Sequence, residues 1–263
     1  MTEPRLRRYA CGSTRFRLSL LFKGAPVEPH VFPSSVFLYR HPSGRRVLFD
    51  TGYAPTMKGL GWASAIYRRL LPPDVSPEAT IDRRLAADGL RPEDIDDVII
   101  SHAHPDHIGG IRYFPDATFV ISRNQLDALA RTDLRSGIIP AVLPDWFDSA
   151  RLRVLDRDDL SGPAPGGLTG FDLFEDGRFV ILDLPGHARG HLGALVEGTV
   201  LLAADAAWGR DQLEAFDRMR ALPRTISHDF SETQATAQLL LALESSGIRL
   251  VFSHDESPSV LLE

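Results

Sequence analysis

Cysteine is nearly absent from this chain, since Cys11 is the single one among 263 residues. A lone cysteine excludes an intrachain disulfide and any zinc site built from cysteine thiolates. If a metal is bound, it must therefore be held by histidine and carboxylate side chains. The lack of disulfides also predicts a reducing, cytoplasmic location.

The chain also lacks long apolar segments and an excess of positive charge. No run approaches the roughly 18 to 20 consecutive apolar residues of a membrane-spanning helix. The basic segment RLRRYACGSTRFRLSL (5–20) has no small-residue cleavage site of a secretory signal. The net charge is −6 and the pI about 5.8, whereas a nucleic-acid surface needs clustered basic residues. We therefore expect neither a membrane nor a nucleic acid as partner.

What is present is typical of a globular protein, with 43% hydrophobic and 24% charged residues. No repeat and no low-complexity linker divides the chain, so we expect one domain over residues 1–263, with a loop at 161–170. Strand-like and helix-like segments alternate in two half-chains of similar order, which indicates a layered α/β fold. The expected strands lie within 15–22, 34–40, 45–50, 96–101, 117–122, 178–187, 198–208 and 248–256, and the expected helices are 56–71, 79–88, one ending near Ala130, and 231–245 starting with Ser231.

Five of the expected strands end at a potential metal ligand. Loops at the strand ends of a layered α/β fold are where ligand sites assemble, because a rigid sheet fixes residues that stay accessible. Imidazole and carboxylate groups together suit a divalent ion. The sequence therefore predicts a shared metal site from these five strand ends, which are Asp50, His102, His187, Asp205 and His254.

The densest group of ligands is in the stretch VIISHAHPDHIGG (98–110). His102 and His104 are two residues apart in an extended segment, so their side chains point the same way and can chelate one ion. The proline turn that follows can direct Asp106 and His107 at a second ion. The spacing thus favours two ions over one.

The ordered set HxHxDH, with DTG upstream and a single histidine, aspartate and histidine downstream, resembles the metallo-β-lactamase superfamily over about residues 34–255. The resemblance implies a four-layer αββα sandwich with mixed sheets and a dinuclear metal site. Asp50 would orient a ligand histidine, or else only cap the turn with Thr51 and Gly52. By the same resemblance, one metal would be held by His102, His104 and His187, the other by Asp106, His107 and His254, with Asp205 bridging.

Within that superfamily, the segments LFDTGY, SHAHPDHIGG, LPGHARGH, LLAADAAW and FSHDE are most similar to the N-acyl homoserine lactonases, which open the lactone ring of quorum-sensing signals. Those enzymes commonly carry a substrate-contacting tyrosine three residues after the bridging aspartate, where this chain has Trp208. An indole N–H can donate a hydrogen bond but cannot act as an acid as a phenol can. The segment before His187 is also longer than in those enzymes.

These features predict a metal-dependent hydrolase that opens a lactone, or cleaves a related carboxylic ester, by attack of a hydroxide held between two divalent ions. Asp106 would relay a proton to the leaving group. We expect zinc, with iron or manganese as alternatives, and a monomer or homodimer acting on a small molecule. Two alternatives stay open: a thioesterase or other acyl hydrolase of this fold, and a ligand-binding regulator with retained metals and little turnover.

Several other residues have a structural interpretation beside a functional one. His191 is expected to order the loop around His187 rather than to bind metal. Trp62 and Tyr67 are expected either to pack a helix or to form a lid over the substrate pocket. The apolar segment 136–147 favours loop packing over a pocket wall. No metal role is expected for the remaining histidines, His30, His41 and His228.

Overall fold

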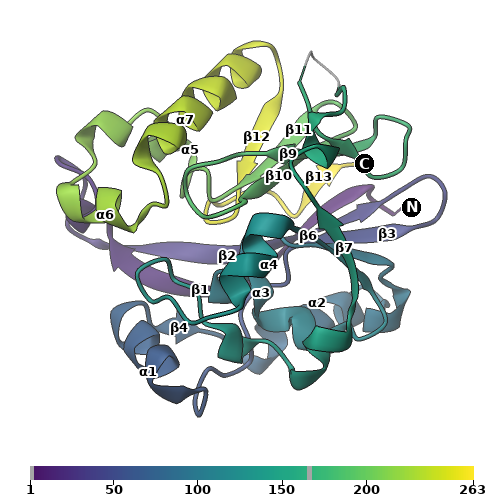
Figure 1. Ribbon diagram of the computed structural model, residues 1–263, viewed down its shortest axis with the longest axis horizontal. Helices are drawn as coiled ribbons and strands as arrows, with labels where there is room; N and C mark the ends of the chain where they lie inside the picture. Colours follow the sequence, from purple (N-terminus) through teal and green to yellow (C-terminus); the bar gives the residue numbers. More distant parts are fainter. Residues whose placement is uncertain (1–2, 165–167) are drawn as a thin grey trace.

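The strands form two sheets in this computed structural model, which describes residues 3–164 and 168–263 (Figure 1). The first sheet has the order β13-β1-β2-β3-β5-β6-β7, with β4 paired to β1, and the second has the order β12-β11-β10-β9-β8. The strands are β1 (Leu6–Arg17), β2 (Pro29–Arg40), β3 (Arg46–Phe49), β4 (Pro73–Asp74), β5 (Asp97–Ile99), β6 (Thr118–Ser122), β7 (Arg151–Leu155), β8 (Phe171–Asp172), β9 (Phe179–Asp183), β10 (Leu192–Val196), β11 (Val200–Ala204), β12 (Arg249–Phe252) and β13 (Val260–Leu262).

Helices cover the outer faces of both sheets, as Figure 1 shows with α1 and α2 on one side and α6 and α7 on the other. Leu85 of α2 is buried in one apolar cluster with Leu48 and Val98 of the first sheet. Leu240 of α7 is buried in another cluster with Leu201 of the second sheet. The helices are α1 (Gly61–Leu70), α2 (Ile81–Ala87), α3 (Pro105–Ile108), α4 (Arg123–Leu129), α5 (Arg210–Leu213), α6 (Ala221–Ile226) and α7 (Phe230–Ser245).

The inner faces of the two sheets pack against each other. Phe37 and Phe49 of the first sheet share a buried cluster with Phe179 and Leu202 of the second. Leu38, next to Phe37 on the same strand, belongs instead to the cluster on the helix side, as the two-residue period of a strand requires. Four layers result, helices–sheet–sheet–helices, and the predicted αββα sandwich is confirmed.

The strands that precede the predicted ligands run in matching directions. In the first sheet β3 and β5 are parallel. In the second sheet β11 and β12 are parallel, and β9 runs with β11 because each is antiparallel to β10. The loops after these strands therefore leave from one end of each sheet, and segments far apart in the sequence meet there.

Several of the predicted element starts are wrong; the strand predicted within 34–40, for example, begins at Pro29. The strand predicted within 15–22 begins much earlier, at Leu6, and ends at Arg17. Helix α7 takes its N-cap from Asp229 rather than starting with Ser231, because the Asp229 carboxylate accepts the backbone N–H groups of Ser231 and Glu232.

In the described part of the chain no helix combines the length and apolar character that crossing a bilayer requires. Residues 165–167 of the loop predicted at 161–170 lie outside the described residues.

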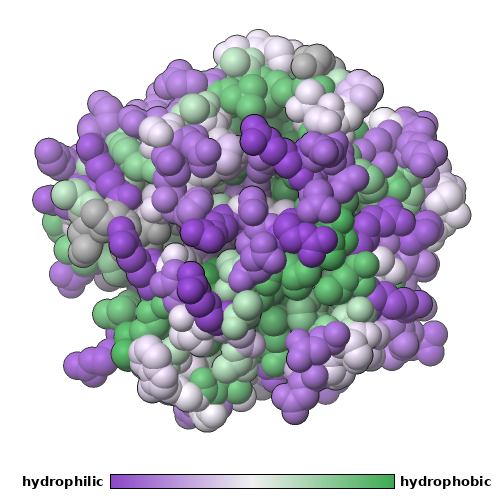
Figure 2. Space-filling model, in the orientation of Figure 1, coloured by the Kyte–Doolittle hydropathy of each residue, from purple (hydrophilic) through white to green (hydrophobic). Residues whose placement is uncertain are grey.

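Helix α1 starts at Gly61, later than predicted, and its apolar side faces outward. Trp62 is 68% exposed and Leu70 66% exposed, whereas Ala63 and Ser64 are the buried residues of the helix. Figure 2 shows hydrophobic surface in the part of the view where α1 lies. The prediction that Trp62 packs the helix against the core is therefore wrong, since the helix turns Ala63 and Ser64 inward, whereas Tyr67 is partly buried against the core as predicted.

Two glycines after the predicted ligands let the first sheet and the ligand loop approach closely. A Cβ at Gly109 would overlap the backbone nitrogen of Ala54, and one at Gly110 would overlap the carbonyl oxygen of Thr51. In the same contact, Thr51 donates to the His107 carbonyl oxygen from its N–H at 2.8 Å and from its hydroxyl at 2.7 Å. The loop after β3 is thus fixed directly against the turn that carries His107.

Replacing Gly109 with alanine should therefore cost more stability than its backbone angles alone suggest. Backbone atoms cannot move aside as a side chain can, so we expect the free energy of unfolding to fall by about 3 kcal/mol, the upper range for overpacking. Gly44→Ala is the matched control, because Gly44 has a positive φ of 91° but open space around it, and about 1 kcal/mol is expected there. Denaturant unfolding measures both, and equal losses would contradict the close approach.

Candidate metal centre

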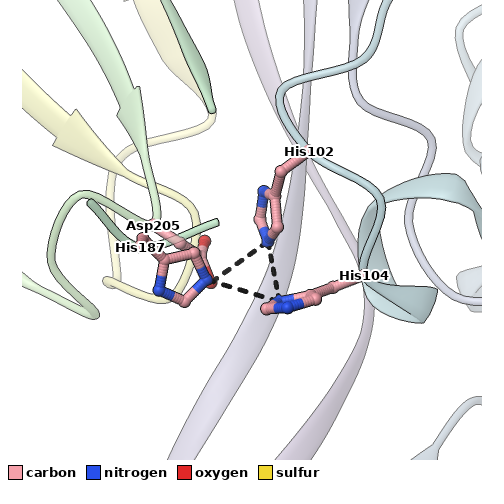
Figure 3. A group of neighbouring side chains, drawn as sticks. All are labelled: His102, His104, His187 and Asp205. Carbon is pink, nitrogen blue, oxygen red and sulfur yellow. Dashed lines mark hydrogen bonds and ion pairs between the residues drawn. The ribbon is translucent and has the colours of Figure 1, made fainter. Parts of the chain in front are cut away.

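Seven predicted ligands from both halves of the chain lie together where the two sheets meet. Figure 3 shows four of them, with the imidazoles of His102, His104 and His187 and the carboxylate of Asp205 directed at one another. Ligand atoms within each of two groups lie within 4.8 Å of one another. The first group is His102, His104, His187 and Asp205, and the second is Asp106, His107 and His254.

The first group is built around the Nδ1 atom of His104. His102 Nε2 lies 2.9 Å from it and His187 Nε2 lies 3.3 Å from it. Asp205 Oδ2 completes the group at 3.6 Å from His187 Nε2 and 3.9 Å from His102 Nε2. Three imidazole nitrogens and one carboxylate oxygen thus surround a common point, which is a donor set that a four-coordinate divalent ion accepts.

The second group shares Asp205 with the first. His254 Nε2 lies 2.9 Å from Asp205 Oδ2, and His107 Nε2 lies 3.4 Å from Asp205 Oδ1. Asp106 Oδ2 lies 3.5 Å from His254 Nε2 and 3.6 Å from His107 Nε2. Asp205 therefore contacts both groups, in the position that the resemblance assigned to a bridging ligand.

Four of the five histidines have their second ring nitrogen held by the surrounding protein. His104 Nε2 lies 2.8 Å from the carbonyl oxygen of Ser136, and His254 Nδ1 lies 2.7 Å from that of Pro33. Carbonyl oxygens only accept, so these nitrogens carry the proton and the opposite nitrogens are free to bind a cation. His102 Nδ1 is similarly 3.0 Å from the Ser101 hydroxyl, and His107 Nδ1 is 2.8 Å from Asp50 Oδ2.

A second observation also indicates that these residues can hold a metal. Among the described residues, His107 Nε2 and Asp205 Oδ1 are buried without a hydrogen-bond partner, although both point into the shared space. A buried polar atom left unpartnered costs free energy, and native proteins rarely keep one without a reason. A divalent cation would satisfy both atoms. The residues present therefore fit two metal ions bound by nitrogen and oxygen.

Burial and the central carboxylates shift the pKa values in opposite directions. Burial lowers the pKa of His102 and His187 well below the usual value, which favours the neutral, metal-binding imidazole. Burial acts the same way on His107 and His254, but the nearby carboxylates, Asp205 foremost, together outweigh it and raise the pKa of both. The pKa of Asp205 is held well below its usual value despite its burial, chiefly by His254 and His107. These two histidines would have to release their extra protons in order to hold a metal.

Asp50 acts on the second group and not on its own turn. Its carboxylate is fully buried, accepts the backbone N–H and the hydroxyl of Ser101 at 2.8 Å each, and lies 2.8 Å from His107 Nδ1. No hydrogen bond from its side chain to Thr51 or Gly52 occurs in the described residues, so the alternative of a simple turn cap receives no support.

His191 and Gln125 connect the segments that carry the ligands. His191 Nδ1 donates to the Leu184 carbonyl at 2.9 Å, and its Nε2 accepts the Asp205 backbone N–H at 3.1 Å, so the ring orders Asp205 more directly than the His187 loop. Gln125 Nε2 donates to the carbonyls of Ser101 and Gly190 at 2.7 and 2.6 Å. Nothing in the sequence marks Gln125 as important, because its partners are backbone atoms that leave no motif.

The histidines without an expected metal role lie outside both ligand groups. His30 is exposed, and His41 pairs with Asp176 at 2.8 Å and stacks on Phe174. His228 is exposed, and its backbone N–H donates to the His187 carbonyl at 3.1 Å.

The tentative substrate-pocket residues differ in their positions. Trp208 packs edge-on against Phe22, with ring centroids 6.1 Å apart, and lines a recess of about 10 Å³ that also borders His187. Trp62 is exposed and lines neither this recess nor the larger cavity beside His187. The hydroxyl of Tyr67 lies 3.2 Å from that of Tyr53, and burial raises the pKa of both phenols, with a further contribution from the charge of Asp106.

The segment 136–147 serves both as core and as cavity wall. Ile139, Val142 and Phe147 are buried in the apolar cluster of the first sheet, as loop packing predicts. Ser136 and Ile138 line a cavity of about 310 Å³ that borders His187. Both alternatives considered for this segment therefore apply, to different residues.

Solved structures share this fold. A mutant of Bacillus thuringiensis AiiA, with N-decanoyl-L-homoserine bound at its active site, superposes with a TM-score of 0.73 at 19% identity, covering 97% of this chain and 94% of that one. AidC, a dizinc quorum-quenching lactonase in complex with a product, superposes with a TM-score of 0.63 at 20% identity, covering 89% of this chain and 76% of that one.

Sequence comparison leads to the same group of proteins. The N-acyl homoserine lactonase AttM of Azorhizobium caulinodans is 27% identical over 269 residues, covering 97% of this chain and 94% of that protein. The sequence profile of the metallo-beta-lactamase superfamily matches residues 30–253. This chain belongs to the metallo-beta-lactamase superfamily.

Proposed function

We propose that this protein is a metal-dependent lactonase, which opens a lactone ring or cleaves a related carboxylic ester. One observation carries the proposal: two ligand groups share Asp205 at a single place in the fold. The similarity to AttM over 97% of the chain supports the lactone as the substrate class. In this proposal His102, His104 and His187 bind one ion, Asp106, His107 and His254 bind the other, and Asp205 bridges them.

The roles of the remaining groups follow from their contacts. When bound, two divalent ions lower the pKa of water and polarise an acyl carbonyl, which makes hydrolysis possible at neutral pH. Asp106, which is 7% exposed, is the carboxylate proposed to carry a proton to the leaving alkoxide. Asp50 and the carbonyls of Ser136 and Pro33 keep their histidines in the binding orientation. Trp208 can donate a hydrogen bond to the substrate but no acidic proton.

Further properties belong to the same proposal. Zinc is the proposed metal, although nitrogen and oxygen ligands also accept iron and manganese. A single domain, a cytoplasmic location, and a monomer or homodimer are proposed as well; the single cysteine, Cys11, supports the location.

A substrate panel tests the reaction. We expect the metal-loaded protein to hydrolyse acyl homoserine lactones and aliphatic lactones faster than acyl thioesters or a chromogenic cephalosporin, measured as kcat/KM for each. Preference for a thioester would contradict the lactonase assignment in favour of a thioesterase. Binding of a panel member without turnover, detected as a raised melting temperature, would instead favour a ligand-binding regulator.

Two single substitutions test the metal assignment. His104→Ala removes a ligand from the first group and His107→Ala one from the second, so we expect metal content to fall below the two ions per chain of the unaltered protein. Activity should fall together with metal content, by about hundredfold or more. Elemental analysis measures the metal, with exposed His30→Ala as the control expected to keep both properties. Full activity in either ligand variant would overturn the assignment.

A substitution at Trp208 tests the lactone chemistry. Trp208→Tyr supplies a phenol that can donate a proton, so we expect kcat for acyl homoserine lactones to rise by about a hundredfold, the low end of general acid catalysis. Trp208→Phe enlarges the recess without adding a hydroxyl and is the matched control. An equal change in both variants would mean that room in the recess, and not the hydroxyl, had been limiting.

A further inference from the structure

The two spaces that border His187 differ in size and in chemistry. The recess lined by Trp208, Phe22 and Met219 also borders polar residues such as Gln212 and Thr233, and it measures only about 10 Å³, which is about enough for one water. The cavity on the side of α4 measures about 310 Å³, within the range of small-molecule sites. A substrate group extending from the metal centre therefore finds room in the larger cavity and not beside Trp208.

The lining of this larger cavity is positively charged in an acidic protein. Arg131, Arg135 and Arg189 line it, against the two carboxylates of Asp127 and Asp133. In Figure 2 strongly hydrophilic side chains cross the middle of this face, the part of the view where α4 and neighbouring loops lie. Ala128, Ile138 and Ala188 add apolar surface to the same lining, but only an anion would gain charge-assisted hydrogen bonds from the arginines.

Two of these arginines have guanidinium groups available to a ligand. Arg131 and Arg189 are exposed and form no hydrogen bond or ion pair with the described residues of the chain. Arg131 does lie within electrostatic reach of Asp133. However, Asp133 is already engaged in its own turn, where it accepts the Arg135 N–H at 3.1 Å and the Ser136 hydroxyl at 2.7 Å.

The segments that carry the two arginines are fixed to each other and to the metal centre. Arg131 follows α4 closely, and Arg189 lies between His187 and Gly190. The Gly190 carbonyl accepts hydrogen bonds from Gln125 Nε2 at 2.6 Å and from the Ser122 hydroxyl at 3.0 Å, both at the start of α4. The cavity wall is therefore preorganised, which lowers the entropic cost of binding a ligand.

We infer that the substrate carries an anionic group, a carboxylate, on the part that extends from the scissile carbonyl into this cavity, and that Arg131 and Arg189 bind it. The inference rests on the proposed function, because the cavity borders the His187 of the first ligand group. A guanidinium binds a carboxylate through two parallel hydrogen bonds, which gives orientation as well as affinity. The preferred substrate class is thus a lactone with an acidic side chain.

A matched substrate pair tests this inference. N-adipoyl homoserine lactone ends in a carboxylate, and its primary amide is neutral and of nearly the same shape. We expect kcat/KM for the acid to exceed that for the amide by at least about tenfold in the unaltered protein. The double variant Arg131→Gln/Arg189→Gln should lose this preference through a raised KM for the acid, so that kcat/KM for the acid no longer exceeds that for the amide.

The controls separate the inference from the proposed function. Arg151→Gln, on exposed residue 151 of the edge strand β7, should keep the preference. Calorimetric titration with the two ring-opened products gives a readout without turnover, and the acid should bind at least tenfold more tightly in the unaltered protein only. Hydrolysis of both lactones with equal kcat/KM, unaffected by the arginine substitutions, would overturn the inference and leave the lactonase assignment intact. If the acid product binds in an arginine-dependent way but neither lactone is hydrolysed, the lactonase assignment is overturned and the anion-binding inference stands.

Discussion

The buried carboxylate of Asp205 is the interaction on which the rest of this structure depends. It lies within 4 Å of four imidazoles, from loops after β5, β9 and β12 and from the start of α3. Burying so many polar groups costs free energy unless each is paired. The sheets must therefore meet with their strand ends in register, because a small displacement would leave charged groups buried and apart. A bound cation turns this costly cluster into a stabilising one.

The surrounding hydrogen bonds explain how the fold holds that arrangement. Asp50 and Ser101 tie the loop after β3 to His107. His191 holds the backbone of Asp205, and Gln125 joins the carbonyls of Ser101 and Gly190 across the two halves of the chain. These groups do not reach the centre, yet each removes a degree of freedom from a segment that does. The ligands are thus held in place by several residues that do not themselves belong to a ligand motif.

The sequence was informative wherever side-chain identity alone decides the outcome. Histidine and aspartate at strand ends predicted a shared metal site, because their side chains can bind a metal, and the family resemblance predicted how the ligands divide into two groups. It was silent on the carbonyls of Ser136 and Pro33, since every residue has a carbonyl and only the fold selects one. It was misleading for α1, where helical periodicity revealed an apolar side but not that Trp62 faces outward. Patterns predict which residues share a face, whereas tertiary packing decides what that face meets.

Substrate choice is a separate problem from the reaction, and a different part of the structure addresses it. The ligand groups can activate water against many acyl bonds, so they do not select among them. Selection depends on the space beside His187, where a recess of about 10 Å³ adjoins Trp208 and a cavity of about 310 Å³ adjoins Arg131 and Arg189. Volume excludes a long substrate group from the recess, and the arginines of the cavity favour an anion on the group that enters it. Together these two constraints favour an anionic substrate, although the ligand groups themselves do not distinguish a charged substrate from a neutral one.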